Sequence, residues 1–489
     1  MTSIKKITPE AVMMHNAFIE WSHGEDHEAL FEFDDVTTNI YAADGNGSRS
    51  PDTLWKAGYF TRLFRGLAEK PVWMQFGRFM YSRDYTTLPE QEIAMTAFSV
   101  VTNGGCPVVI DNAFPDGSID VPSRKRLENV YNKIRSKERY LGHDWEPGYA
   151  ALLYSKESQD WLDMSKSGGS YYFGFAGAYK LLLESHIPFQ VISDRKLTKE
   201  KLKQFKILVL SDCAVMSKET ADLIRDFAAQ GGSVIAMGIT GSINPKWRTN
   251  SSMPLADVFG IRKTGALNYS NSYAAVTDGA IFGDIDSYTT VLLRDCYPER
   301  FETVGNARVI MLSKLPATEV KAGRIFTYAD DVAPGEITEP FAAVNTFRKG
   351  KTVYFGGNIA RIYGVYGSPE LRSVFQGALG YCGEAPVKTS APPFVELALY
   401  KKAADYVIHL MNYAMGQLRL TSHAGGYAAE HTLPVYDINV SVRFADWEEE
   451  APKSIKLEDG TDIPFTVDGG YVRFSIPRLE THLLVIIGF

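Results

Sequence analysis

The fold is decided by residues 71–120, which read PVWMQFGRFMYSRDYTTLPEQEIAMTAFSVVTNGGCPVVIDNAFPDGSID. A first apolar run ends near Arg78, an amphipathic segment covers residues 88–103, and a second apolar run ends at Asp111. This order predicts a strand, a helix and a second, parallel strand. Polar side chains then follow the carboxyl ends of both strands, which is typical of an α/β barrel with its site at that edge.

Composition sets the broad class of the protein. The chain has 489 residues, of which 45% are hydrophobic and 22% charged, the balance of a globular protein. The net charge of −7 provides no basic field, so we expect no binding to nucleic acid or acidic membranes. The start of the chain lacks the apolar core of a signal peptide, and we expect a cytoplasmic protein. The aromatic content of 12% is typical either of large packed cores or of carbohydrate recognition.

The cysteines carry no metal or redox pattern. The four residues are widely spaced, with no CxxC pair and no histidine at metal-ligand spacing. We therefore expect four buried free thiols, no metal and no organic cofactor. Cys213 follows an apolar strand, as a nucleophilic cysteine does in amidotransferase-like folds, but it lacks a glycine elbow, and an inert thiol is expected.

Residues 1–146 hold about three strand–helix units. The Thr8-Pro9 pair predicts a helix start, with apolar residues from Val12 to Trp21 on one face. A short strand is predicted over residues 29–35 and a second helix over residues 53–68. A complete α/β barrel has eight such units in roughly 250 residues. This region is therefore either a smaller open α/β layer or the carboxyl half of a barrel.

Two further domains are predicted. Residues 147–388 alternate strands with helices, which indicates a doubly wound, flavodoxin-like sheet with a β-rich insertion near residues 250–340. Residues 389–489 begin with the linker TSAPP and continue as short strands separated by turns such as Asp459-Gly460, which indicates a β-sandwich. The fold class is therefore α/β and multidomain.

Three acids lie in the predicted strand over residues 29–35. Alternation places Glu32 and Asp34 on one side of that strand and Asp35 on the other. Paired carboxylates can serve as acid and base, or as acid and nucleophile, around a glycosidic bond. Acids just after a strand can equally cap a helix or solvate a loop.

Arg78 and Asp111 are the candidates at the other two strand ends. Arg78, with Trp73 nearby, can orient a carboxylate or donate to sugar hydroxyls, or it can form an ion pair with Asp84. Asp111 and Asn112 follow a buried strand and can line the mouth of a site. Asp111 can alternatively bond the loop amides of Gly117 or Ser118.

The order of these motifs resembles glycoside hydrolases related to α-L-fucosidases and β-galactosidases. The final barrel strand of such enzymes is similar to Ile110-Asp111-Asn112 followed by Pro115-Asp116-Gly117 and Asp120, and the helix ending in Glu138 also fits. Residues 207–238 and 349–363 resemble the β-galactosidase trimerisation domain, and residues 407–414 (VIHLMNYA) resemble the carboxyl-terminal β domain. The resemblance covers nearly the whole chain.

The resemblance implies a retaining glycosidase for α-L-fucosides or related sugars. It implies Asp34 as the catalytic acid/base, and a sugar site lined by Glu32, Asp35, Trp73, Arg78, Asp111 and Asn112. Such enzymes carry a catalytic carboxylate, usually the nucleophile, on a central barrel strand, and no residue of this sequence matches it. The alternative is a non-catalytic carbohydrate-binding or assembly subunit that lacks the front half of the barrel or takes it from a separately encoded partner. A homotrimer is also implied.

Overall fold

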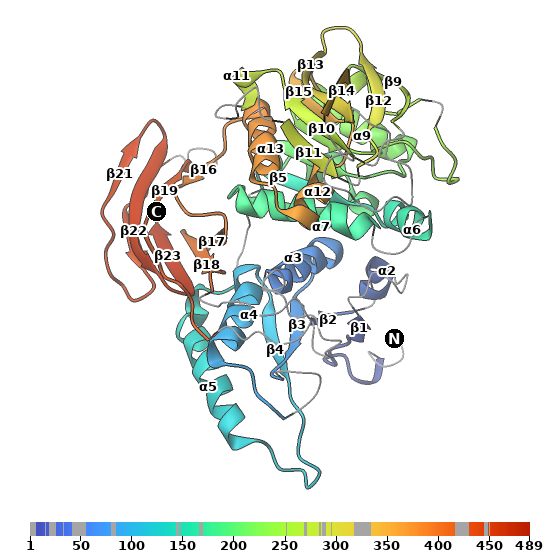
Figure 1. Ribbon diagram of the computed structural model, residues 1–489. Helices are drawn as coiled ribbons and strands as arrows, with labels where there is room; N and C mark the ends of the chain where they lie inside the picture. The colour runs from blue at the N-terminus through green and yellow to red at the C-terminus, as the bar shows by residue number, and fades with distance from the viewer. Residues whose placement is uncertain are drawn as a thin grey trace. The chain divides into compact units, whose positions relative to one another are not determined.

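The computed structural model (Figure 1) describes residues 6–489 except 15, 19–25, 33, 42–54, 80–84, 143–145, 147, 166–169, 251, 268–270, 283–284, 286–289, 295, 317–333, 416–429, 445–447 and 449. The chain forms two compact units. Unit 1 combines residues 1–147 with residues 386–489, and unit 2 comprises residues 148–385. The first and last parts of the sequence therefore share one unit, and the middle of the chain forms the other.

An open parallel sheet begins unit 1. Its four strands lie in the order β1 (Asn16–Phe18), β2 (Thr37–Tyr41), β3 (Val72–Gly77) and β4 (Cys106–Ile110). No closed barrel forms among the described residues. The helices of this layer are α2 (His27–Phe31), α3 (Lys56–Ala68), α4 (Glu90–Thr102) and α5 (Val121–Ser136), and the short helix η3 (Glu138–Tyr140) follows α5.

One face of this sheet is covered and the other is open in the described part of the chain. Val72, Met74 and Phe76 of β3 are buried on the side of α3 and α4, whereas Trp73 between them is 37% exposed. Cys106 of β4, which pairs in register with Trp73, is also exposed. Parallel sheets are usually covered on both faces, so this exposure distinguishes the layer from a closed α/β fold.

Two expected elements near the amino terminus are wrong. Residues 29–31 belong to helix α2, because Asp26 caps it by accepting from Ala29 N at 3.2 Å and Phe31 packs edge-on against Phe64 of α3. The strand of this unit is β2, which begins only at Thr37. Within the helix predicted from Val12 to Trp21, the structure has strand β1, since residues 16–18 pair with β2.

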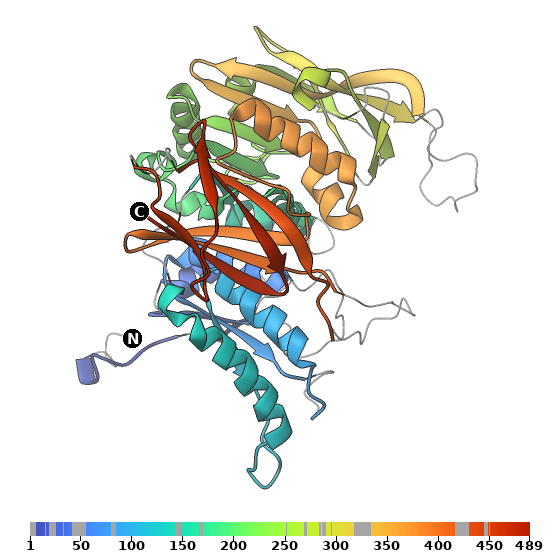
Figure 2. The ribbon, with the colours of Figure 1, turned by 90° about the vertical axis from the view of Figure 1, so that its left-hand side faces the viewer.

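Two antiparallel sheets complete unit 1. One has the order β16-β19-β22-β21 and the other β17-β18-β23-β20, and their inward-facing side chains share one core. Figure 2 shows these late strands (red) beside helices of the first part of the chain, and Lys137, the residue after α5, contacts His482 of β23. The strands are β16 (Val387–Thr389), β17 (Val395–Lys402), β18 (Asp405–Asn412), β19 (Val435–Val442), β20 (Ser454–Leu457), β21 (Phe465–Asp468), β22 (Tyr471–Leu479) and β23 (His482–Gly488).

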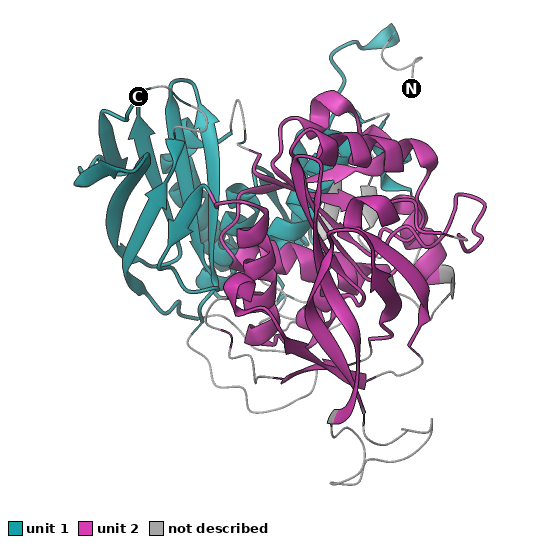
Figure 3. Cartoon of the chain, turned by 90° about the horizontal axis from the view of Figure 1, so that it is seen from above, with its two compact units in different colours: residues 1–147, 386–489 teal, residues 148–385 magenta. Residues whose placement is uncertain are grey.

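Unit 2 is built on a nine-stranded sheet (Figure 3), in the order β11-β10-β13-β14-β15-β8-β7-β5-β6. Its parallel part, β6-β5-β7-β8-β15, has the flavodoxin-like order 2-1-3-4-5. These strands are β5 (Ala150–Tyr154), β6 (Phe189–Ser193), β7 (Ile207–Ser211), β8 (Ser233–Met237) and β15 (Gly350–Phe355). The side chains of β5, β7 and β8 are buried throughout, as expected of strands with helices on both faces.

Between β8 and β15 the chain inserts mostly antiparallel strands. Four of them extend the sheet: β10 (Asn271–Val276), β11 (Thr290–Arg294), β13 (Arg308–Pro316) and β14 (Pro334–Phe347). The other two, β9 (Ile261–Ala266) and β12 (Glu299–Thr303), form a separate pair. The helices of unit 2 are α6 (Lys156–Ser165), α7 (Ser170–Glu184), α8 (Lys199–Leu202), α9 (Lys218–Ala229), α10 (Ala256–Phe259), α11 (Gly279–Phe282), α12 (Ile359–Tyr366) and α13 (Pro369–Cys382), with η4 (Asp194–Lys196) after β6.

Candidate functional site

Polar side chains meet where β3 and β4 end. Arg78 follows β3 directly and Asp111 follows β4, and the two strands are paired up to Gly77 and Ile110. The Arg78 Nε donates to Asp111 Oδ1 at 2.5 Å. Arg78 therefore binds the Asp111 carboxylate. The alternative prediction, an ion pair of Arg78 with Asp84, falls on a residue outside the described residues.

Arg78 itself is completely buried. Its Nη1 donates to Thr87 Oγ1 at 2.8 Å and lies 3.9 Å from Asp120 Oδ2, while its guanidinium lies over the Phe79 ring. The Nη2 atom is buried as well, without a hydrogen-bond partner among the described residues. Because the side chain has 0% exposure, Arg78 does not face solvent, and it holds Asp111 from behind the surface.

Asp111 keeps one oxygen available. Oδ1 accepts from Arg78 and from the backbone N–H of Asn112 at 2.7 Å, whereas Oδ2 makes no hydrogen bond in the described part of the chain. The side chain is 26% exposed. The alternative expectation, in which Asp111 bonds the amides of Gly117 or Ser118, is wrong, because Asp116 accepts from Ser118 N at 2.9 Å.

An aromatic pair lies beside Asp111. The rings of Tyr85 and Phe114 are stacked with centroids 4.8 Å apart and planes inclined by 17°. The Tyr85 hydroxyl donates to the Ala113 carbonyl at 3.1 Å, and the side chain remains 44% exposed. Sequence reasoning missed Tyr85, because a tyrosine in a loop carries no periodic signal.

Asp120 has a structural role at the start of α5. Its carboxylate caps the helix by accepting from Ser123 N at 3.4 Å and from Ser123 Oγ at 2.5 Å. The Ser123 hydroxyl, followed by the Arg78 charge, lowers the pKa of Asp120. This carboxylate is therefore ionised at neutral pH.

Asp34 lies at the opposite edge of the sheet. It precedes β2, whose first residue Thr37 pairs with Val72, the first residue of β3. Arg78 follows the last of the six residues of β3, so the two edges are separated by about 20 Å. The expected meeting of Asp34 with Arg78 and Asp111 is therefore wrong, because the strand predicted before Asp34 is a helix.

The residues around Asp34 make structural hydrogen bonds at the amino-terminal ends of the strands. Lys70 Nζ donates to the carbonyls of Phe31, Glu32 and Asp34, and so covers the end of α2. Asp35 accepts from Met13 N at 2.8 Å. Trp73 lies near the start of β3 on the open face. Of the predicted site residues, the structure thus brings together only Arg78, Asp111 and Asn112.

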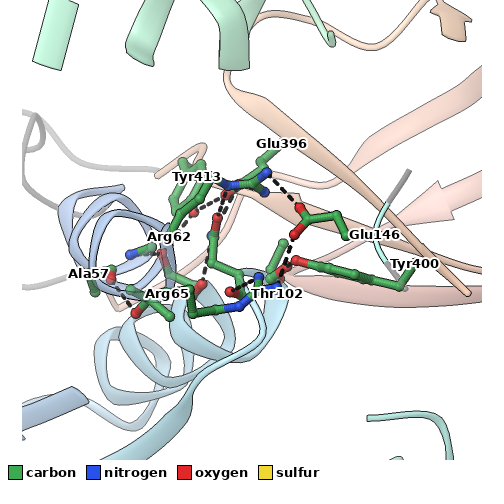
Figure 4. Close-up of polar contacts among 12 residues, drawn as sticks. Ala57, Arg62, Arg65, Thr102, Glu146, Glu396, Tyr400 and Tyr413 are labelled. Atoms are coloured by element: carbon green, nitrogen blue, oxygen red, sulfur yellow. Dashed lines mark hydrogen bonds and ion pairs between the residues drawn. The ribbon is translucent and has the colours of Figure 1, made fainter. Parts of the chain in front are cut away.

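A buried ionic cluster lies elsewhere in unit 1 (Figure 4). Arg62 of α3 donates to Glu146 at 3.0 Å and lies 3.7 Å from Glu396 of β17. Asn103 connects these groups, accepting from Arg62 Nε at 2.8 Å and donating to Glu396 at 3.1 Å. Arg62 and Glu396 are 6% and 3% exposed, so no ligand reaches them and the cluster is structural. The lone glutamate in the apolar run VELALY was the sequence signal for it.

In unit 2, described side chains bond to backbone groups at the crevice where ligands usually bind in a doubly wound sheet. This crevice lies at the carboxyl ends of β5 and β7. The buried Tyr171 accepts from Ser155 N at 2.8 Å there, and Ser158 Oγ accepts from Val215 N at 3.0 Å. Cys213 is 1% exposed and burial raises the pKa of its thiol, as an inert cysteine requires.

Neither a membrane-spanning helix nor a metal-binding cluster is present within the described ranges. No helix there is both long and apolar enough to cross a membrane. No group of three His, Cys, Asp or Glu side chains there is arranged to hold a metal ion.

Comparisons with known proteins find likeness at the level of structure. No protein-family model and no curated protein matches the sequence. The fold is similar to α-L-fucosidase isoenzyme 2 from Paenibacillus thiaminolyticus (TM-score 0.79, 20% identity), over 100% of this chain and 70% of that one. It is also similar to the β-galactosidases from Bacillus circulans sp. alkalophilus (TM-score 0.68, 14% identity) and Rahnella sp. R3 (TM-score 0.68, 15% identity), over 100% of this chain and 65% of each. Over its whole length, the chain therefore has the fold of part of these glycoside hydrolases.

Proposed function

We propose that the chain acts as a glycoside hydrolase on α-L-fucosides or related sugars. The observation that carries this proposal is Asp111, which a buried arginine holds at the carboxyl ends of two adjacent parallel strands. That edge carries the site in α/β barrel enzymes. The fold shared with an α-L-fucosidase over the whole chain supports the same substrate class.

The reaction proposed is a retaining double displacement. It requires two carboxylates about 5–5.5 Å apart, one as nucleophile and one as acid and then base. Asp111 and Asn112 line the sugar site in this proposal, and Asp111 Oδ2 accepts a hydrogen bond from a sugar hydroxyl. Four strands of this layer are described, against eight in a complete barrel, and the proposal assigns neither reacting carboxylate among them.

One observation favours a second candidate function. Asp34 lies about 20 Å from the edge where Asp111 lies, so these two carboxylates do not act together on one glycosidic bond. This separation is compatible with a non-catalytic carbohydrate-binding or assembly subunit. Such a subunit would be completed by a separately encoded front half of the barrel. Assembly into a homotrimer remains a prediction in both cases, and light scattering at micromolar concentration checks it.

Asp111→Asn is expected to lower kcat/KM for an aryl α-L-fucoside roughly 10- to 150-fold. The substitution replaces a charged acceptor, and a hydrogen bond to a charged group contributes about 1.5–3 kcal/mol. Steady-state hydrolysis of 4-nitrophenyl α-L-fucoside measures the effect. Asp459→Asn is the matched control, because Asp459 caps the Thr461 amide in a hairpin of the late strands.

Two outcomes would redirect the proposal. If Asp34→Asn abolishes hydrolysis while circular dichroism shows an intact fold, Asp34 belongs to the site after all. If the folded chain hydrolyses no aryl glycoside alone but does so when mixed with a separately produced front half of the barrel, the subunit function replaces the first.

A further inference from the structure

The loop after β3 holds one tyrosine ring rigidly at the surface. One face of the Tyr85 ring stacks on Phe114, and its hydroxyl is bound to the Ala113 carbonyl. These two contacts fix the plane of the ring, which is nevertheless 44% exposed. A fixed and partly exposed aromatic ring is a surface on which the C–H face of a pyranose can pack.

Tyr85 and Asp111 are both bound by Arg78. The Arg78 guanidinium binds both partners, through Nε to Asp111 Oδ1 at 2.5 Å and through Nη1 to the Tyr85 carbonyl at 3.5 Å. Ala113, which accepts from the Tyr85 hydroxyl, is only two residues beyond Asp111. The exposed ring and Asp111 Oδ2 therefore lie at the same edge of the sheet, close enough for one sugar to reach both.

The charges at this edge are unequally accessible. The Arg78 cation is buried, whereas the Asp111 side chain is 26% exposed. Arg126, beside Asp120, is held by the carbonyls of Thr87 and Leu88 at 3.2 and 3.0 Å. Among the described residues, a ligand that rests on Tyr85 therefore meets the Asp111 carboxylate and not the buried Arg78 guanidinium.

We propose that Tyr85 and Asp111 form a subsite for a neutral pyranose, with the sugar's C–H face on the Tyr85 ring and one hydroxyl donating to Asp111 Oδ2. Anionic sugars, such as uronic acids, are rejected there because their carboxylate faces Asp111. The inference rests on the proposed function, because it assigns the sugar class and a specificity residue to the same site.

Binding, measured separately from hydrolysis, tests the subsite. Saturation-transfer NMR titrations of the full chain compare methyl α-L-fucoside with methyl α-D-galacturonide. Wild type is expected to bind the fucoside at least tenfold more tightly than the galacturonide. Tyr85→Ala is expected to weaken fucoside binding roughly tenfold, since the ring contributes stacking and apolar contact. Tyr85→Phe keeps the ring but loses the hydrogen bond to Ala113, so it is expected to weaken fucoside binding less than Tyr85→Ala does.

A charge-specific readout separates this role from a merely structural one. Asp111→Asn is expected to weaken fucoside binding and to strengthen galacturonide binding, because the repulsion between two carboxylates is removed. Tyr436→Ala is the matched control, since Tyr436 is an exposed tyrosine of β19. Circular dichroism verifies that each variant is folded.

The experiments distinguish failure of the subsite from failure of the proposed catalytic function. Unchanged fucoside binding in Tyr85→Ala, equal binding of the two sugars by wild type, or no binding of either sugar overturns the subsite. Fucoside binding with these preferences but without hydrolysis overturns only the proposed catalytic function. Hydrolysis that is insensitive to Tyr85→Ala overturns only the subsite.

Discussion

Glu396→Ala is expected to lower the free energy of unfolding of unit 1 by about 3–5 kcal/mol. Glu396 accepts from Asn103 Nδ2 at 3.1 Å and from the Tyr413 hydroxyl at 2.6 Å, and Arg62 lies 3.7 Å away. Removing the carboxylate breaks two hydrogen bonds to a charged group, from Asn103 and from Tyr413, each of which contributes about 1.5–3 kcal/mol. It also takes one of two nearby counter-charges from Arg62, which keeps its ion pair with Glu146. Differential scanning calorimetry measures the change in the transition of unit 1.

Two further variants make this prediction specific. Arg62→Met combined with Glu396→Leu is expected to recover much of the lost stability, since an apolar pair of similar volume replaces the buried charges. The control is Glu302→Gln, which removes an exposed ion pair with Arg262 and is expected to cost under about 1 kcal/mol. A loss below 1 kcal/mol in Glu396→Ala would contradict the structural role of the cluster.

The pH dependence of stability is expected to depend on His482. Burial, then the charge of Lys137 and then His409, lower the pKa of His482 well below its ordinary value of 6.5. Lys137 Nζ lies 3.1 Å from His482 Nδ1 and 2.8 Å from the Glu458 carboxylate. On the other side, His409 Nδ1 lies 3.2 Å from His482 Nε2, and the Phe98 ring stacks on the His482 imidazole. The imidazole is therefore neutral in the folded protein at neutral pH.

The sign of the effect follows from proton binding. Below pH 6.5 the unfolded chain takes up a proton on His482 that the folded protein does not, so acid favours unfolding. The free energy of unfolding is expected to fall by up to about 1.4 kcal/mol per pH unit from this group as pH drops from 6.5 toward 5. Urea denaturation at several pH values measures the slope.

His482→Gln is expected to remove this contribution, so that its stability changes less than that of wild type between pH 7 and 5. His431→Gln is the matched control, because His431 is exposed and its substitution is expected to preserve the wild-type slope. An unchanged slope in His482→Gln would mean that other groups account for the acid sensitivity.

The elements that could be predicted from sequence are those with a strong local pattern. The apolar runs around β3 and β4 and the amphipathic segment of α4 lie where the periodicity of residues 71–120 places them. The same holds for β7, α9 and β8, where an apolar run, an amphipathic helix and a glycine pair follow one another. In these stretches local preference and tertiary packing agree.

The predictions that failed did so because tertiary contacts decide the structure at those residues. The short run over residues 29–35 fits a strand equally well, but the Asp26 cap and the packing of Phe31 on Phe64 select a helix. As a result, Asp34 lies at the amino-terminal ends of the strands and not at the carboxyl ends, where it was predicted. The ionic cluster was missed for another reason, because Arg62 and Glu396 are separated by more than three hundred residues and no local rule pairs them.

The two-part composition of unit 1 has a consequence for biosynthesis. Glu396 cannot meet Arg62 until the ribosome has made the residues that follow unit 2 in the sequence. Unit 2 is continuous and can fold while synthesis proceeds, as domains generally do. During that interval Arg62 and Asn103 lack their contact with Glu396, although Arg62 can already bind Glu146. The nascent first segment is therefore the part of the chain most in need of chaperone protection.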